Sequence, residues 1–184
     1  SVGYNAMRNY QGTNNTALGT NSLDFIGTGN NNTAIGFGAD VNLTNLTNAT
    51  AIGANAIVNA SNKVRIGSTA VTVIEGQPAG YTSASDGRFK KDVREDVKGV
   101  DFIMKLRPVT YNFDRVSYSM FIGEKQDDVY TKTLSALSEV RQTGFIAQEM
   151  DKAITASGYT GFDAVSKPNA DKEAYGISYA TLVV

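Results

Sequence analysis

The 184-residue chain contains no cysteine and no histidine. Without cysteine it can form neither a disulfide framework nor a thiolate metal site, and without histidine it lacks the usual general base and the commonest metal ligand. Any acid–base chemistry therefore falls to Lys, Asp, Glu, Tyr or Ser. The acidic pairs Glu95-Asp96 and Asp127-Asp128 do not have the spacing of known calcium loops. We expect neither a metal nor a cofactor.

Long apolar runs and an excess of one charge are missing as well. No run approaches the roughly 18–20 apolar residues that a membrane-spanning helix needs, so we expect no membrane insertion. The net charge of −1 predicts no nucleic-acid partner. The opening residues have the pattern of a repeat interior rather than of a charged-then-apolar leader, so we expect the chain to be part of a longer one.

Charge is scarce in residues 1–80, which carry three basic and three acidic side chains, whereas residues 81–184 carry 14 and 15. The first part is solvated by Asn and Thr and the second by charge. This change predicts a repeat region at residues 1–74, with a last strand at Val71–Ile74, and a linker at residues 75–84. A small mixed domain follows at residues 85–184.

A short phrase recurs five times in the first region, with its glycines 16, 17, 17 and 14 residues apart. Each phrase has a branched aliphatic residue followed by a glycine, which suits a short strand that ends in a tight turn. We expect the aliphatic side chain to point inward and the glycine to permit close backbone approach or positive φ. The phrases are Ser1-Val2-Gly3-Tyr4-Asn5-Ala6, Ala17-Leu18-Gly19-Thr20-Asn21-Ser22, Ala34-Ile35-Gly36-Phe37-Gly38-Ala39, Ala51-Ile52-Gly53-Ala54-Asn55-Ala56 and Arg65-Ile66-Gly67-Ser68-Thr69-Ala70.

One such repeat has little core of its own. It contributes about one large aliphatic residue, whose burial at roughly 25 cal/mol per Å² offsets little of a backbone entropy cost of about 1–2 kcal/mol per residue. Stacking repeats helps, and burying a second face against sister chains would help more. We therefore expect an obligate oligomer. The alternative is an Asn/Thr-rich low-complexity linker, which would not keep an aliphatic–Gly step in phase.

The phrase Ala-Ile-Gly-x-x-Ala at this spacing resembles the head repeat of trimeric autotransporter adhesins of the YadA type, over about residues 1–70. The resemblance implies a left-handed parallel β-roll, a solenoid assembled as a homotrimer.

Residues 85–184 read as an α+β domain with few elements. Periodicity predicts a helix between Val97 and Leu106, closed by Pro108, and a strand at Val109–Phe113. We expect Tyr118–Ile122 either to pair with that strand or to extend as a hairpin arm. Gly144–Ile146 is expected to form a buried strand, and an amphipathic helix to run from Ala147 to near Gly158. A last short strand is expected at Tyr175–Tyr179. Phe145, Ile146 and Met150 are predicted core residues, and Glu149 is predicted on a solvated face.

Three phrases in this domain resemble the peptidase S74 family, the C-terminal intramolecular chaperone of endosialidase-type phage tailspikes and tail fibres. They are Ser85-Asp86-Gly87-Arg88-Phe89-Lys90-Lys91-Asp92-Val93, Gly144-Phe145-Ile146-Ala147-Gln148-Glu149-Met150 and Tyr175-Gly176-Ile177-Ser178-Tyr179-Ala180-Thr181-Leu182-Val183. The resemblance implies release of the chaperone by autoproteolysis at the Ser-Asp motif after trimerisation. Family members continue into a helix after the last phrase, so we expect that helix to be truncated at Val184.

The resemblance makes Ser85 the nucleophile and Lys90 its general base, with the cut next to Ser85, at the Ser85–Asp86 bond. A serine hydroxyl needs a base, and burial against apolar groups together with nearby positive charge lowers a lysine pKa. Asp86 and Arg88 match supporting motif positions, to which we assign orientation and ion pairing. The plainer interpretation is that Ser85-Asp86 caps a turn and Lys90-Lys91 is a solvated pair.

The two resemblances together imply the C-terminal region of a homotrimeric phage tail fibre or tailspike, part of a virion, whose S74-like domain templates the trimerisation and folding of the shaft and then releases itself. Its host-surface contact, to a glycan or a protein, would lie on the shaft or upstream. Its enzymatic activity would be a single intramolecular turnover of a Ser-Lys serine peptidase. The alternative is a bacterial cell-surface adhesin whose C-terminal domain is a non-cleaving trimerisation cap. A depolymerase tailspike is a third interpretation, but the repeats offer no carboxylate pair for glycoside hydrolysis.

Overall fold

The computed structural model describes residues 1–25, 27–75, 83–169 and 171–182, which divide into two compact units. The first unit comprises residues 1–72, 110–143 and 167–174, and the second comprises residues 73–109, 144–166 and 175–184. Residues 85–184 thus contribute to both units. Of the predicted linker at 75–84, residues 76–82 lie outside the described residues, and the predicted domain boundaries stay a prediction.

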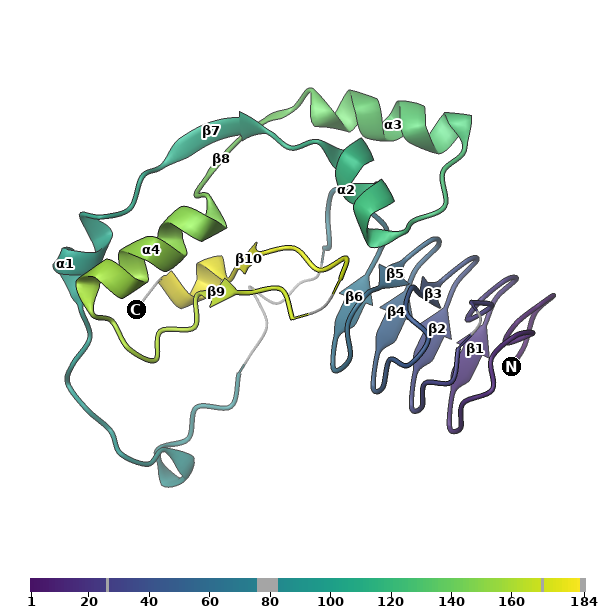
Figure 1. Cartoon of the computed structure of the whole chain (residues 1–184), viewed down its shortest axis with the longest axis horizontal. Helices are drawn as coiled ribbons and strands as arrows, with labels where there is room; N and C mark the ends of the chain where they lie inside the picture. The colour runs from purple at the N-terminus through teal and green to yellow at the C-terminus, as the bar shows by residue number, and fades with distance from the viewer. Residues whose placement is uncertain (26, 76–82, 170, 183–184) are drawn as a thin grey trace. The chain divides into compact units, whose positions relative to one another are not determined.

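The phrases of the first region form a parallel sheet in the order β1 (Thr16–Leu18), β2 (Thr33–Ile35), β4 (Thr50–Ile52) and β6 (Val64–Ile66) (Figure 1). The register follows the sequence repeat, since Ala17 pairs with Ala34 and Ala34 with Ala51. A second parallel pair joins β3 (Asp40–Val41) to β5 (Ile57–Val58). The predicted strands of the second to fifth phrases are confirmed, whereas Val71–Ile74 is not a strand.

Backbone conformation explains why these repeats are rich in Gly and Asn. Gly36 has φ +129°, and a Cβ placed on it would lie 2.7 Å from the carbonyl carbon of Gly53 in the next repeat, so the predicted close approach is confirmed. Asparagines occupy the left-handed region at one turn of each repeat, with φ of 56–59° at Asn14, Asn31, Asn48 and Asn62. Asparagine tolerates that conformation better than other side chains do. The amide of Asn48 also donates to Asn62 Oδ1 at 3.0 Å, which links successive repeats.

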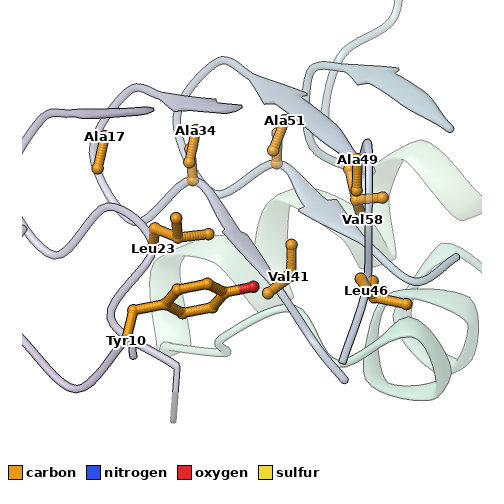
Figure 2. Close-up of a cluster of buried hydrophobic side chains, with 11 residues drawn as sticks. Tyr10, Ala17, Leu23, Ala34, Val41, Leu46, Ala49, Ala51 and Val58 are labelled. Atoms are coloured by element: carbon orange, nitrogen blue, oxygen red, sulfur yellow. The ribbon is translucent and has the colours of Figure 1, made fainter. Parts of the chain in front are cut away.

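Alanines, not the larger aliphatic residues, face the inside of the stack. Ala17, Ala34 and Ala51 are at most 2% exposed and lie in a row above Leu23, Tyr10 and Val41 (Figure 2). The prediction that the aliphatic residue of each phrase points inward is therefore wrong. Neighbouring strand residues point to opposite faces of a sheet, and the narrow interior holds the small residue, so its aliphatic neighbour is directed outward.

Residues 109–144 form β7 (Val109–Asn112), α2 (Arg115–Ile122), α3 (Asp128–Ser138) and β8 (Arg141–Gly144), with β7 paired to β8, and all but the end residues Val109 and Gly144 belong to the first unit. The predicted strand at Tyr118–Ile122 is wrong, because this segment lies within α2. Asp114 caps that helix by accepting from Ser117 N at 2.9 Å, and Gly123 ends it with φ +84°. Helix α3 was not predicted, although Asp127 caps it in the same way.

The second unit contains α1 (Gly99–Ile103), α4 (Ala147–Ser157) and the antiparallel pair β9 (Val165–Ser166) and β10 (Gly176–Ile177). Two short 3-10 helices, η1 (Gly87–Phe89) and η2 (Tyr179–Leu182), lie in the same unit. The predictions of helices α1 and α4, of strand β7 and of a last short strand are confirmed. The predicted strand at 144–146 is wrong, because β8 ends at Gly144 and Ile146 is the N-cap of α4.

The core of the second unit is small. Phe102 packs edge to face against Tyr159 and Phe162, and Met150 and Ala153 of α4 complete the centre. Met150 is confirmed as a core residue and Phe145 packs against the core, whereas Ile146 is 40% exposed.

Candidate functional site

The Ser85–Lys90 segment is an exposed turn in the second unit. Asp86 is the N-cap of η1, and its carboxylate accepts from the backbone N–H of Arg88 at 2.9 Å. Lys90 leaves the turn in an extended conformation, with its N–H bonded to Gly87 O at 3.2 Å. The Asp-Gly pair therefore produces the tight turn locally, without support from packing.

Asp86 and Arg88 form the ion pair of this turn. The Arg88 Nη2 lies 2.6 Å from Asp86 Oδ2, and Nε lies 3.0–3.1 Å from both carboxylate oxygens. This fork holds the pKa of Asp86 below its ordinary value and raises the pKa of Arg88. The Arg88 guanidinium also lies 5.6 Å from the centre of the Phe89 ring. These contacts orient the main chain between Ser85 and Lys90.

Ser85 and Lys90 themselves are both exposed, and within the described part of the chain no hydrogen bond joins their side chains. Phe89, which precedes Lys90, is exposed too. The apolar burial that would activate the lysine is thus not provided by the surroundings of this segment in one chain. The assignment of nucleophile and base stays a prediction.

A buried charge network in the first unit was missed by the sequence predictions. The side chain of Glu124 is fully buried, and its Oε1 accepts from Arg65 Nη2 at 2.8 Å and from Thr69 N at 2.9 Å. Its Oε2 accepts from Ser119 Oγ and from Tyr130 OH, both at 2.7 Å. All four contacts come from hydrogen-bond donors, which is the condition for burying a carboxylate.

The sequence feature that points to this network lies in the last repeat. Arg65 pairs with Ala51 in the sheet, so an arginine stands where the earlier repeats place a buried alanine. A cation on an inward-facing position requires a buried acid, and Glu124 supplies it from the loop after α2. This network therefore joins residues 110–143 to the final strand of the stack.

Glu149 of the second phrase lies on the exposed face of α4, as predicted, but it is paired. Its carboxylate oxygens accept from Arg107 Nε at 3.0 Å and from Nη2 at 2.5 Å. The fork lowers the pKa of Glu149 below its ordinary value and raises that of Arg107. Being exposed, this pair ties the start of α4 to the end of the α1 segment without a large gain in stability.

Among the residues that the structure describes, no group of three or more acidic side chains could hold a metal ion. Over the same residues, no helix is long and apolar enough to cross a membrane.

A comparison with family models matches residues 85–159 to the peptidase S74 family, described as the chaperone of endosialidase. The match begins at Ser85, which is the first residue of the phrases that resemble this family. This match does not cover residues 1–70, whose resemblance to adhesin head repeats stays a proposal. Neither the curated proteins nor the solved structures contain a match to this chain. Residues 85–159 are therefore a peptidase S74 region, a chaperone region of the kind found in endosialidase-like tail proteins.

Proposed function

We propose that this chain is the C-terminal region of a trimeric phage tail fibre or tailspike. In this proposal residues 1–74 are a left-handed β-roll shaft, and the peptidase S74 region templates the trimerisation and folding of that shaft. The template then releases itself by Ser-Lys autoproteolysis next to Ser85. The shaft, or a segment upstream of it, would contact a glycan or protein on the host surface.

The observation that carries the trimer is a row of outward-facing aliphatic side chains, here called the aliphatic column. Its members are in register across the parallel sheet and are 37–67% exposed. They are Val2, Leu18, Ile35, Ile52 and Ile66. Covering their exposed parts with sister chains would contribute roughly 1 kcal/mol each. A continuous apolar row of this kind is typical of an interaction surface.

The second unit offers a further apolar surface for self-association. Beside the small core lies a hollow of about 220 Å³, lined by Phe102, Leu106, Phe145 and Phe162 among others. Val97 and Ile103 at its rim are exposed. A unit with so little buried core gains stability when sister chains cover such residues.

A template is needed because the repeats resemble one another. Three chains displaced by one repeat would still match alanine with alanine and aliphatic with aliphatic, so a register slip costs little. A folded trimeric seed would fix the three ends before the repeats assemble. The Glu124 contact to Arg65 supports this proposal, because it fastens the S74 region to the last repeat. A second contact reaches an earlier repeat, where Asn42 Nδ2 donates to the Ile122 carbonyl at 2.7 Å.

The cleavage can be written as a balanced acyl transfer. Lys90 Nζ accepts the Ser85 Oγ proton while Oγ bonds to a peptide carbonyl carbon, and the protonated lysine then donates to the leaving nitrogen as the C–N bond breaks. Water hydrolyses the resulting ester and restores Ser85. Attack by Oγ on its own carbonyl would need a four-membered ring. A cut at Ser85–Asp86 therefore calls for the hydroxyl of a sister chain, whereas attack on the Ala84 carbonyl needs only a five-membered ring.

Intact mass and a denaturing gel test the cleavage directly. The parent chain is expected to give residues 1–85 and 86–184, while Ser85→Ala and Lys90→Ala stay whole. Lys91→Ala is the matched control, because it removes a neighbouring lysine outside the proposed dyad, and it should cleave. A cut after Ala84 would instead assign the attack to the same chain. An uncut parent in a confirmed trimer would refute the peptidase role.

A second candidate is a bacterial surface adhesin with a non-cleaving trimerisation cap. The observation that favours it is the lack of contact between Ser85 and Lys90 in the described chain. It predicts a trimer in which parent and Ser85→Ala are equally intact.

A further inference from the structure

A small mixed pocket lies in the first unit, where the end of the repeat meets residues 110–143. It has a volume of about 290 Å³. Its walls combine three aromatic residues with two guanidinium groups, contributed by Tyr111, Phe113, Tyr118, Arg65 and Arg115. Concave sites that pair aromatic walls with a few polar groups are the usual form of small-ligand sites.

The two arginines of this pocket are not in the same electrostatic state. Arg65 is neutralised by the buried carboxylate of Glu124 at 2.8 Å. Arg115 has no carboxylate within ion-pair distance among the described residues, and its only side-chain hydrogen bond there is from Nη1 to the Thr69 carbonyl at 2.7 Å. Its Nε is buried without any partner. The pocket therefore holds one uncompensated, partly buried positive charge.

Such a charge is costly, because a desolvated guanidinium loses its hydration without gaining a counter-ion. A carboxylate is the group that matches a planar guanidinium best, through paired N–H···O bonds. Arg115 therefore favours a ligand that carries a carboxylate. The other residues of the wall indicate the rest of that ligand.

The aromatic wall of the pocket is partly exposed. Phe113 and Tyr118 pack edge to face with ring centres 5.3 Å apart, and Phe113 remains exposed. Gln142 adds an amide at the rim, which both donates and accepts hydrogen bonds. A ring with apolar C–H faces and hydroxyl edges fits aromatic faces beside an amide, and the volume suits one ring of that size.

We propose that this pocket binds a sugar acid. The carboxylate would pair with Arg115, the ring would lie against Tyr111, Phe113 and Tyr118, and a hydroxyl would bond to Gln142. Every residue of the pocket belongs to the first unit of one chain, so the inference needs neither the Ser85–Lys90 dyad nor a sister chain. Because the walls lie on both sides of Ser85, the experiments use the uncut Ser85→Ala chain.

Ligand-observed NMR and titration calorimetry of the purified chain with glucuronate, glucose and sulfate test the proposal. Glucuronate should bind, while glucose, which lacks the carboxylate, should bind at least about tenfold more weakly. Sulfate, a bare anion, should not compete at equal concentration. Equal binding of glucose and glucuronate, no glucuronate binding at millimolar concentration, or full competition by sulfate would each overturn it.

Variants locate the site. Arg115→Gln should weaken glucuronate binding at least about tenfold, since a charged hydrogen-bonded pair is lost, and Arg115→Lys should restore part of it. Arg141→Gln is the matched control, because it removes the same charge from the exposed neighbouring strand β8, outside the pocket. Phe113→Ala removes an exposed wall residue and should also weaken binding, which keeps the test valid if Arg115→Gln does not fold. Equal losses in Arg115→Gln and Arg141→Gln would refute the site.

Discussion

Replacing Glu124 with glutamine probes the junction between the repeat and the residues that follow it. The substitution keeps the side-chain shape but removes the charge that faces Arg65, whose side chain is only 17% exposed. Breaking a buried ion pair from one side costs about 3–5 kcal/mol. Because Arg65 keeps its bonds to Gly67 O and Thr69 Oγ1, and Ser119 and Tyr130 can turn their hydroxyls, we expect a smaller loss of about 2–3 kcal/mol.

Urea and thermal unfolding at fixed protein concentration measure this loss, which corresponds to a decrease in Tm of roughly 4–12 °C for a chain of this size. The matched partner is Arg65→Ala, which restores the alanine of the earlier repeats and removes the cation together with its need for an acid. In a double-mutant cycle the two changes should couple by at least about 1 kcal/mol. A loss below about 0.5 kcal/mol for Glu124→Gln, or strict additivity, would refute the reasoning.

Three further substitutions test the repeat. Gly36→Ala should destabilise the stack by at least about 3 kcal/mol in urea unfolding, since its Cβ would meet the next repeat at positive φ, whereas Gly99→Ala has open space and should cost under about 1 kcal/mol. Burial raises the pKa of Asp40 from about 3.8 to about 7, so its folded form holds a proton that the unfolded chain releases. Stability should therefore fall by on the order of 4 kcal/mol as pH rises from about 4 to 7, and Asp40→Asn should remove that slope. Ile52→Asn in the aliphatic column should raise the concentration at which the trimer dissociates at least about tenfold, whereas the exposed Val129→Asn should not, as measured by sedimentation.

The groups that favour ionisation of Asp40 do not outweigh its burial, so stability is still expected to fall as pH rises. Its carboxylate accepts from the backbone N–H groups of Phe25 and Val41, which favour ionisation, as does the more distant Lys125. Asp24 and burial act in the opposite direction, and burial is the largest effect. A stability profile that rises between pH 4 and 7 would show that the carboxylate is ionised in the folded chain.

The repeat could be predicted from sequence because its signals are local. A glycine at each turn and an aliphatic neighbour recur in phase, and the resulting strands β1, β2, β4 and β6 align as the spacing requires. The local sequence does not determine which face of each strand is buried. Alternation places Ala34 and Ile35 on opposite faces, but only the narrow width of the stack determines that alanine faces inward.

In the second region, helices with clear ends were predicted and ambiguous short segments were not. Gly158 ends α4 in the left-handed conformation, and Pro108 follows α1. Tyr118–Ile122 is rich in aromatic and aliphatic residues, as strands often are, yet the caps at Asp114 and Gly123 favour a helix.

At the candidate site, the Asp86–Arg88 fork could be anticipated because both residues lie within one turn. Glu124 and Arg65 lie 59 positions apart in the sequence, so no local sequence pattern predicts that they pair. The proposed Ser85–Lys90 dyad needs an environment that these two residues do not create by themselves.

Native mass spectrometry of the freshly expressed parent chain tests the central claim most directly, because it reports stoichiometry and cleavage together. The chain has a mass of 19.6 kDa, so templated assembly followed by release predicts shaft complexes of three copies, together with S74 fragments cut next to Ser85. In Ser85→Ala the same measurement should give an intact trimer of about 59 kDa, three times the chain mass. A folded, uncut monomer of 19.6 kDa in the parent would contradict both the template and its release.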